Sequence, residues 1–130
     1  MENKNIQKTT AEESSDIFAV AEDQDKKNAA IDYAAFVMQL ARPLVHDEKT
    51  YTELTFNFED LSGNDSLAIE RELQMLGHTV IVASFDSEYL IRVCVKACTE
   101  KLGLDALGKL SIRDFNRLRN TVRGFLLRKE

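Results

Sequence analysis

Few residues of this sequence have the types and the spacing that catalysis needs. The acidic pairs Glu59-Asp60 and Glu70 with Glu72 could in principle supply a general acid and a general base. Two carboxylates do this work only in a cleft that shifts the pKa of at least one of them. Here they fall at an expected helix start and on the solvent face of an expected helix. We therefore interpret both pairs as surface acids.

The histidines and cysteines do not form a recognisable metal site either. His46 falls in an expected turn, and His78 comes directly after an expected helix end. Cys94 and Cys98 would share one face of a helix, where a disulfide would be strained, so two small core side chains are the simpler interpretation. The sequence thus predicts a protein that is not an enzyme, with no catalytic residue, no cofactor and no bound metal.

The composition limits the class of protein further. The chain has 130 residues, of which 44% are hydrophobic and 30% charged, and this suits one small domain. The net charge of −5 argues against general binding of nucleic acid. The first residues do not resemble a signal peptide, and the apolar stretches are too short to span a membrane. We expect a cytoplasmic protein, or one made in the cytoplasm of a host cell, with no membrane partner.

Charge and polarity divide the chain into two parts. Residues 1–33 carry four basic and eight acidic side chains, with one apolar island at Ile17–Val20. Such a segment buries too little apolar surface to offset the entropy lost on ordering. We predict a flexible acidic arm at residues 1–32, in which the island is either a short binding motif or a chance cluster. A single small domain should follow at residues 33–130.

The domain should open with a β-hairpin. Phe36, Met38 and Leu40 recur at every second position, which predicts a strand that Arg42-Pro43 ends, although the alanine-rich residues 29–41 also fit a helix. A polar turn at His46–Lys49 and a second strand at Tyr51–Phe58 favour the hairpin. The buried side of the second strand should carry Thr52, Leu54, Phe56 and Phe58.

Three amphipathic helices should cover this hairpin. The first runs from Gly63 or Asn64 to Leu76, and Gly77 is placed to cap its end. The second runs from Ser84 or Asp86 to about Lys101. The third begins after the cap Ser111, with Asp114 in a capping-box-like position. Leu104–Leu107 should form a single turn, and Val80–Ala83 a third short strand or a buried connection.

The buried faces of these helices follow from their apolar spacing. The expected buried residues are Ile69, Leu73 and Leu76 in the first helix, Phe85, Tyr89, Leu90, Val93, Cys94, Ala97 and Cys98 in the second, and Ile112, Phe115, Leu118, Val122, Phe125 and Leu126 in the third. The predicted fold class is therefore α+β: an N-terminal β-hairpin packed against about three α-helices, preceded by a disordered N-terminal arm.

The last helix is basic, which raises a nucleic-acid alternative. Residues 111–130 hold six basic and two acidic side chains, including Arg113, Arg117, Arg119 and Arg123. These could line a nucleic-acid face of a small regulator. No helix-turn-helix spacing precedes them, and arginine is also favoured near a helix C-terminus. An acidic protein segment is the better expected ligand.

In its ordered part the sequence resembles the phage tail assembly chaperone family. The likeness spans about Met38 to Leu127. It rests on four patterns in order: Leu40-Ala-Arg-Pro43 with Tyr51-Thr-Glu-Leu54; Phe56–Asp65 with Glu70-Arg-Glu72 and Leu76-Gly77; Tyr89–Ala97; and Leu110–Phe115 with Phe125–Leu127. The acidic arm before Tyr33 is longer than the family core needs, and Thr79–Ala83 is more apolar than expected.

This resemblance implies a function without catalysis. Members of the family bind the long helical tape measure protein, keep it soluble and help to recruit tail tube protein in a phage, prophage or phage-tail-like particle. Wide apolar helix faces suit such a helical client. We predict partner-binding residues at Tyr89, Val93, Arg117, Val122, Arg123 and Phe125, and we expect self-association because a small domain must accommodate many apolar side chains.

Overall fold

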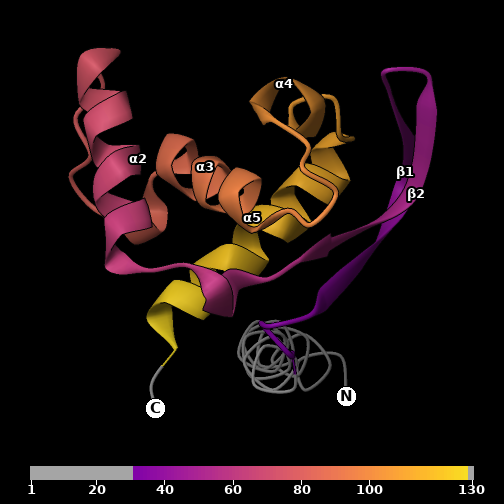
Figure 1. Ribbon diagram of the computed structural model, residues 1–130, viewed down its shortest axis with the longest axis horizontal. Coiled ribbons are helices and arrows are strands. Elements are labelled where there is room, and N and C mark those ends of the chain that lie inside the picture. The colour runs from indigo at the N-terminus through magenta and orange to yellow at the C-terminus, as the bar shows by residue number, and fades with distance from the viewer. Residues whose placement is uncertain (1–30, 129–130) are drawn as a thin grey trace, which may run out of the picture. The chain divides into compact units, whose positions relative to one another are not determined.

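The computed structural model describes residues 31–128, so the predicted arm at residues 1–32 lies almost wholly outside the described residues. The described chain folds as a two-stranded hairpin followed by helices (Figure 1), which confirms the predicted α+β class. None of the helices in this part of the chain combines the length and the apolar character needed to cross a membrane.

The hairpin joins β1 (Phe36–His46) to β2 (Lys49–Phe56) in antiparallel register. Its turn lies where the sequence predicted it. Asp47 and Glu48 both have positive φ angles, 49° and 65°, as a two-residue turn that matches the twist of the strands requires.

The prediction that Arg42-Pro43 ends the first strand is wrong. Gln39 pairs with Glu53 and Leu44 pairs with Tyr51, so residues 40–43 of β1 lie opposite Thr52 alone. This is a β-bulge, one of the few places in a sheet where a proline without an N–H is tolerated. The strand therefore continues past Pro43 to His46.

The second strand is shorter at its end than predicted. Leu54 and Phe56 are buried as expected, whereas Thr52 is exposed opposite the bulge. Phe58 is buried but belongs to the 3-10 helix η1 (Phe58–Asp60), because the Asn57 side chain accepts a hydrogen bond from the N–H of Asp60 and turns the chain. The second strand therefore ends at Phe56, two residues before the predicted end at Phe58.

The first α-helix, α2 (Gly63–Met75), begins where predicted and ends one residue before the predicted Leu76. Asp65 accepts a hydrogen bond of 2.8 Å from the N–H of Ser62 at the start. At the end, Gly77 has a φ of 81°, and the N–H of His78 donates to the carbonyl of Leu73. This is a Schellman cap. Leu76 lies at the cap and is 66% exposed, so its predicted burial is wrong.

The connection from α2 to α3 is exposed. Val80–Ala83 forms neither a strand nor a buried segment, since Ile81 is 88% exposed, and it leads into the 3-10 helix η2 (Ala83–Phe85). Phe85 is 63% exposed because it precedes the helix whose buried face it was predicted to join. This connection leaves apolar side chains in solvent.

Helix α3 (Ser87–Ala97) is the central element, capped by Asp86. It contacts α2, α4 and α5 (Figure 1), and its predicted apolar face from Tyr89 to Ala97 is buried. It ends at Ala97 rather than at Lys101. The reason is that residues 98–100 turn to the outer edge of β2, where the N–H of Thr99 donates to the carbonyl of Thr55.

The chain closes with α4 (Leu104–Leu107), the predicted single turn, and α5 (Ile112–Leu127). Ser111 caps α5 as predicted. Leu118 and Val122 are fully buried as predicted, but Ile112, the first residue of α5, is 80% exposed, so its predicted burial is wrong. Cys94 and Cys98 are buried free thiols, which confirms their interpretation as core side chains.

Candidate apolar groove

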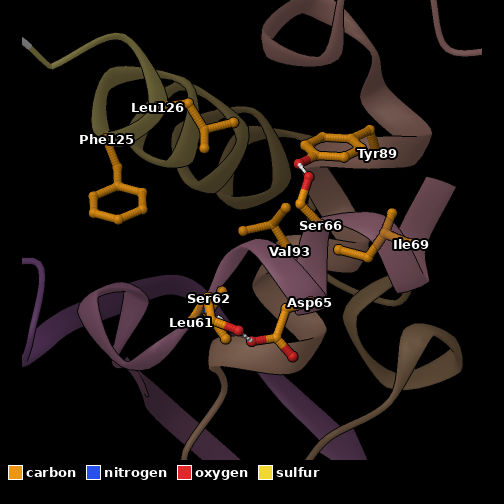
Figure 2. Close-up of a pocket in the computed structure, with 9 residues that line it drawn as sticks. All are labelled: Leu61, Ser62, Asp65, Ser66, Ile69, Tyr89, Val93, Phe125 and Leu126. Atoms are coloured by element: carbon orange, nitrogen blue, oxygen red, sulfur yellow. Dashed lines mark hydrogen bonds between the residues drawn. The ribbon is translucent and has the colours of Figure 1, made fainter.

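A mostly apolar groove of about 180 Å³ lies where α2, α3 and α5 converge. Its walls are apolar side chains from the three helices and from the turn before α2: Leu61, Ile69, Tyr89, Val93, Phe125 and Leu126. Figure 2 shows these residues, with Phe125 and Leu126 on α5 and the others on α2, α3 and the preceding turn. A concave apolar surface between helices is the usual form of a site for an apolar ligand or a partner helix.

The α3 wall follows from helical spacing. Tyr89 and Val93 are four residues apart and therefore point the same way. Both side chains are largely buried. The Tyr89 hydroxyl and the Ser66 hydroxyl of α2 share a hydrogen bond of 2.5 Å, drawn as a dashed line in Figure 2. This bond satisfies the phenol, so Tyr89 can present its ring to the groove.

The α5 wall is held by an aromatic cluster. The Phe125 ring lies 5.1 Å from that of Tyr33 and 5.5 Å from that of Phe58, measured between ring centroids. Arg128 lies over the Tyr33 ring and forms an ion pair of 3.0 Å with Glu59. Burial raises the pKa of the Tyr33 phenol, although Arg128 acts in the opposite direction. These contacts hold the last turn of α5 against the start of η1.

A second set of contacts fixes α5 to the hairpin. The carboxylate of Asp114, fully buried, accepts hydrogen bonds from the N–H groups of Ala41 and Arg42 in the bulge of β1, at 3.0 to 3.2 Å. It also accepts from the Ser111 hydroxyl and from Arg117. Burial alone would raise the pKa of this carboxyl, but the hydrogen bonds lower it below the ordinary value. Asp114 therefore both lies in the first turn of α5 and fixes this helix to the bulge of β1.

The structure brings three of the six predicted partner-binding residues together. Tyr89, Val93 and Phe125 line the groove. Val122 is fully buried in the core. Arg117 donates to the carbonyl of Gln39 and Arg123 to that of Ser84, so both guanidinium groups lie outside the groove lining.

Sequence reasoning missed the residues that complete the groove. Ile69 and Leu126 were assigned to buried stripes, Leu61 fell within the Phe56–Asp65 pattern, and Ser66 was not considered. The available signal was the run of apolar residues Phe125–Leu127 at the end of the last helix. Nothing in the sequence states that this helix end meets the start of the first helix.

One acid of each pair considered for catalysis, Glu72 and Glu59, forms an ion pair. Glu72 and Glu88 both form ion pairs with the largely buried Arg92. Glu59 pairs with Arg128 at the end of α5. Neither arrangement places two carboxylates together in the groove.

The titratable side chains near α3 are also engaged. His78 Nε2 lies 2.6 Å from Asp86 Oδ2, and Asp86 caps α3. Burial raises the pKa of the Cys94 thiol well above its ordinary value, which disfavours the reactive thiolate. Between residues 31 and 128, no three His, Cys, Asp or Glu side chains gather as metal ligands would.

Comparison with known proteins gives one result. The model of a family described as phage tail assembly chaperone proteins, E, or 41 or 14, matches residues 37–127. The match runs from β1 to the last residue of α5. No curated protein and no solved structure matches the chain.

Proposed function

Because this chain belongs to the family of phage tail assembly chaperones, we propose that it is a non-enzymatic chaperone for the tape measure protein. In this role it assists assembly of the tail tube of a phage, prophage or phage-tail-like particle, in the cytoplasm of the bacterial host. Tape measure protein and tail tube protein are its proposed partners. The family match across the whole described fold is the observation that carries this proposal.

The apolar groove is the proposed client site. A tape measure segment is expected to be an amphipathic helix, and such a helix binds by laying its apolar face into a groove between other helices. Phe125 and Leu126 offer partly exposed apolar surface at the α5 wall, and the largely buried Tyr89 and Val93 form the α3 wall. The client would cover side chains that otherwise remain in contact with water.

Arg117 and Arg123, two of the arginines that raised the alternative of a nucleic-acid-binding regulator, both make contacts within the fold. Arg117 donates to the carbonyl of Gln39 and pairs with Asp114, and Arg123 donates to the carbonyl of Ser84. Both arginine side chains therefore have a structural role, because they connect α5 to other segments of the chain. Two of the four acids considered for catalysis, Glu59 and Glu72, are used in ion pairs, which supports a role without catalysis.

Leu126→Glu tests the groove. Leu126 is 37% exposed, so the substitution should leave the core intact but place a charge in the proposed client site. Binding would bury the exposed part of the leucine, roughly a third of the 1.5–3 kcal/mol for a whole side chain, and a carboxylate there would also lose hydration. Affinity for the tape measure protein should therefore fall about tenfold. The measurement is the amount of soluble tape measure protein that co-purifies after co-expression.

Leu104→Glu provides the matched control. Leu104 is 41% exposed, lies on α4 and does not line the groove. It should leave co-purification unchanged. Equal co-purification of both variants with the tape measure protein would reject the groove as the client site. Failure of the unsubstituted chain to form any complex with a tail protein would reject the proposed function itself.

A further inference from the structure

Two arginines of α5 are held in place by neutral groups. Arg123 donates from Nε to the carbonyl of Ser84, at 2.9 Å, and from Nη1 to the side-chain oxygen of Asn120. Arg119 donates to the Ser87 hydroxyl, at 2.9 Å, and to the side-chain oxygen of Asn116, at 3.0 Å. Their positions are therefore fixed without neutralising their charge.

Three other arginines in residues 31–128 have their charge paired, whereas Arg42, Arg71 and Arg113 form no ion pair within this range either. Arg92, Arg117 and Arg128 each form an ion pair with a carboxylate. Within this part of the chain, neither Arg119 nor Arg123 lies within ion-pair distance of an acid. Two uncompensated and preorganised guanidinium groups thus lie one turn apart on α5, beside the start of α3.

An exposed apolar surface adjoins these charges. The guanidinium carbon of Arg123 lies 5.0 Å from the centre of the Phe85 ring, and that ring is 63% exposed. Val82, which precedes η2, is 51% exposed. Arginine and aromatic side chains are the types most enriched where binding energy concentrates in protein interfaces. None of these residues lines the groove.

We propose that Arg119, Arg123, Phe85 and Val82 form a second docking surface, separate from the groove. Its occupant is a protein segment that carries an apolar side chain flanked by carboxylates. The apolar side chain packs on Phe85 and Val82, and the carboxylates pair with the two guanidinium groups. Charge complementarity selects this occupant, because held guanidinium groups bind planar carboxylates through paired N–H donors.

A nuclear magnetic resonance titration tests the surface on the full chain labelled with ¹⁵N. The probe is a synthetic amphipathic peptide of about 16 residues, some four helical turns, with leucines on one face and glutamates along both edges of it. Amide signals of residues 82–87 and 116–123 should shift in a saturable manner. Signals of Ser66, Ile69 and Val93 in the groove should remain in place.

Variants decide which groups bind the probe. Arg119→Gln with Arg123→Gln keeps side-chain donors but removes both charges, and should weaken peptide binding at least about tenfold. Arg113→Gln is the control, because it removes one charge from another face of α5 and should change binding less than about twofold. A peptide with glutamine in place of glutamate should lose affinity as the double variant does. The spectrum of each variant verifies that it is folded.

Several outcomes would overturn the proposal. These are no saturable shift up to millimolar peptide, equal binding by the glutamine peptide, shifts confined to the groove, or tighter binding of duplex DNA to these same residues at the same salt concentration. The result is independent of the client groove, because Leu126→Glu should leave binding of the acidic peptide unchanged.

Discussion

At the scale of the residue, Asp114 is a fully buried carboxylate in the described chain, and its charge depends on its hydrogen bonds. Its buried carboxylate accepts from two backbone N–H groups of β1 and from Ser111, and it pairs with Arg117. Because these bonds stabilise the charged form, the pKa of Asp114 is lower in the folded chain than in the unfolded chain. This charge therefore contributes stability above the unfolded pKa, about 3.9, and that contribution is lost as pH falls through the folded pKa.

Asp114→Asn should destabilise the fold by about 1–3 kcal/mol at neutral pH, because buried donors of the bulge lose a charged acceptor. Urea unfolding at neutral pH and at acidic pH measures the effect. The difference between the variant and the unsubstituted chain should shrink as the solution is acidified, since both then lack the charge. Asp60→Asn, at an exposed position, is the control and should change little. A difference that stays constant with pH would contradict the role given to the charge.

At the scale of the element, the two glycines at the ends of α2 differ in the backbone conformation that each adopts. Gly77 adopts a φ of 81° in the Schellman cap, where a side chain is strained even though the space around it is open. Gly63, in the first turn, also has open space but does not adopt a positive φ. The backbone, and not packing, therefore distinguishes the two positions.

Gly77→Ala should lower the free energy of unfolding by about 1 kcal/mol, whereas Gly63→Ala should leave it unchanged or raise it by about 0.4–1 kcal/mol. Thermal unfolding of the two variants side by side gives the comparison. Equal effects would mean that the cap of α2 does not depend on the left-handed conformation of residue 77.

The sequence could predict the ends of elements that depend on neighbouring residues. It could not predict ends that depend on contacts with residues far away in the chain. The Asp47-Glu48 turn, the cap at Gly77 and the start of α5 at Ser111 all depend on neighbours in the sequence. In contrast, β1 passes Pro43 because Asp114, some seventy residues later, binds the bulge. Helix α3 ends early because Thr99 binds the edge of β2. The same limit applies to the groove, whose α3 wall was predicted and whose α2 wall was not.

At the scale of the whole molecule, many large apolar side chains remain in solvent. Met75 and Ile81 are each 88% exposed, at the end of α2 and in the connection that follows it. Ile112 is 80% exposed at the start of α5. A small domain has a high ratio of surface to volume and cannot bury all of its apolar side chains by itself. Contacts with other chains are one way to remove this surface from water.

We propose that the full chain self-associates, and light scattering across a range of concentrations tests this. The expected mass exceeds the 14.8 kDa of one chain and rises towards a fixed multiple as concentration increases. The reason is that mass action populates the state with the least exposed apolar surface. A mass of one chain at every concentration would contradict self-association. In that case we expect tail proteins to cover the exposed side chains of α2 and α5. Co-expression with the tape measure protein should then protect the backbone amides of these residues from hydrogen exchange.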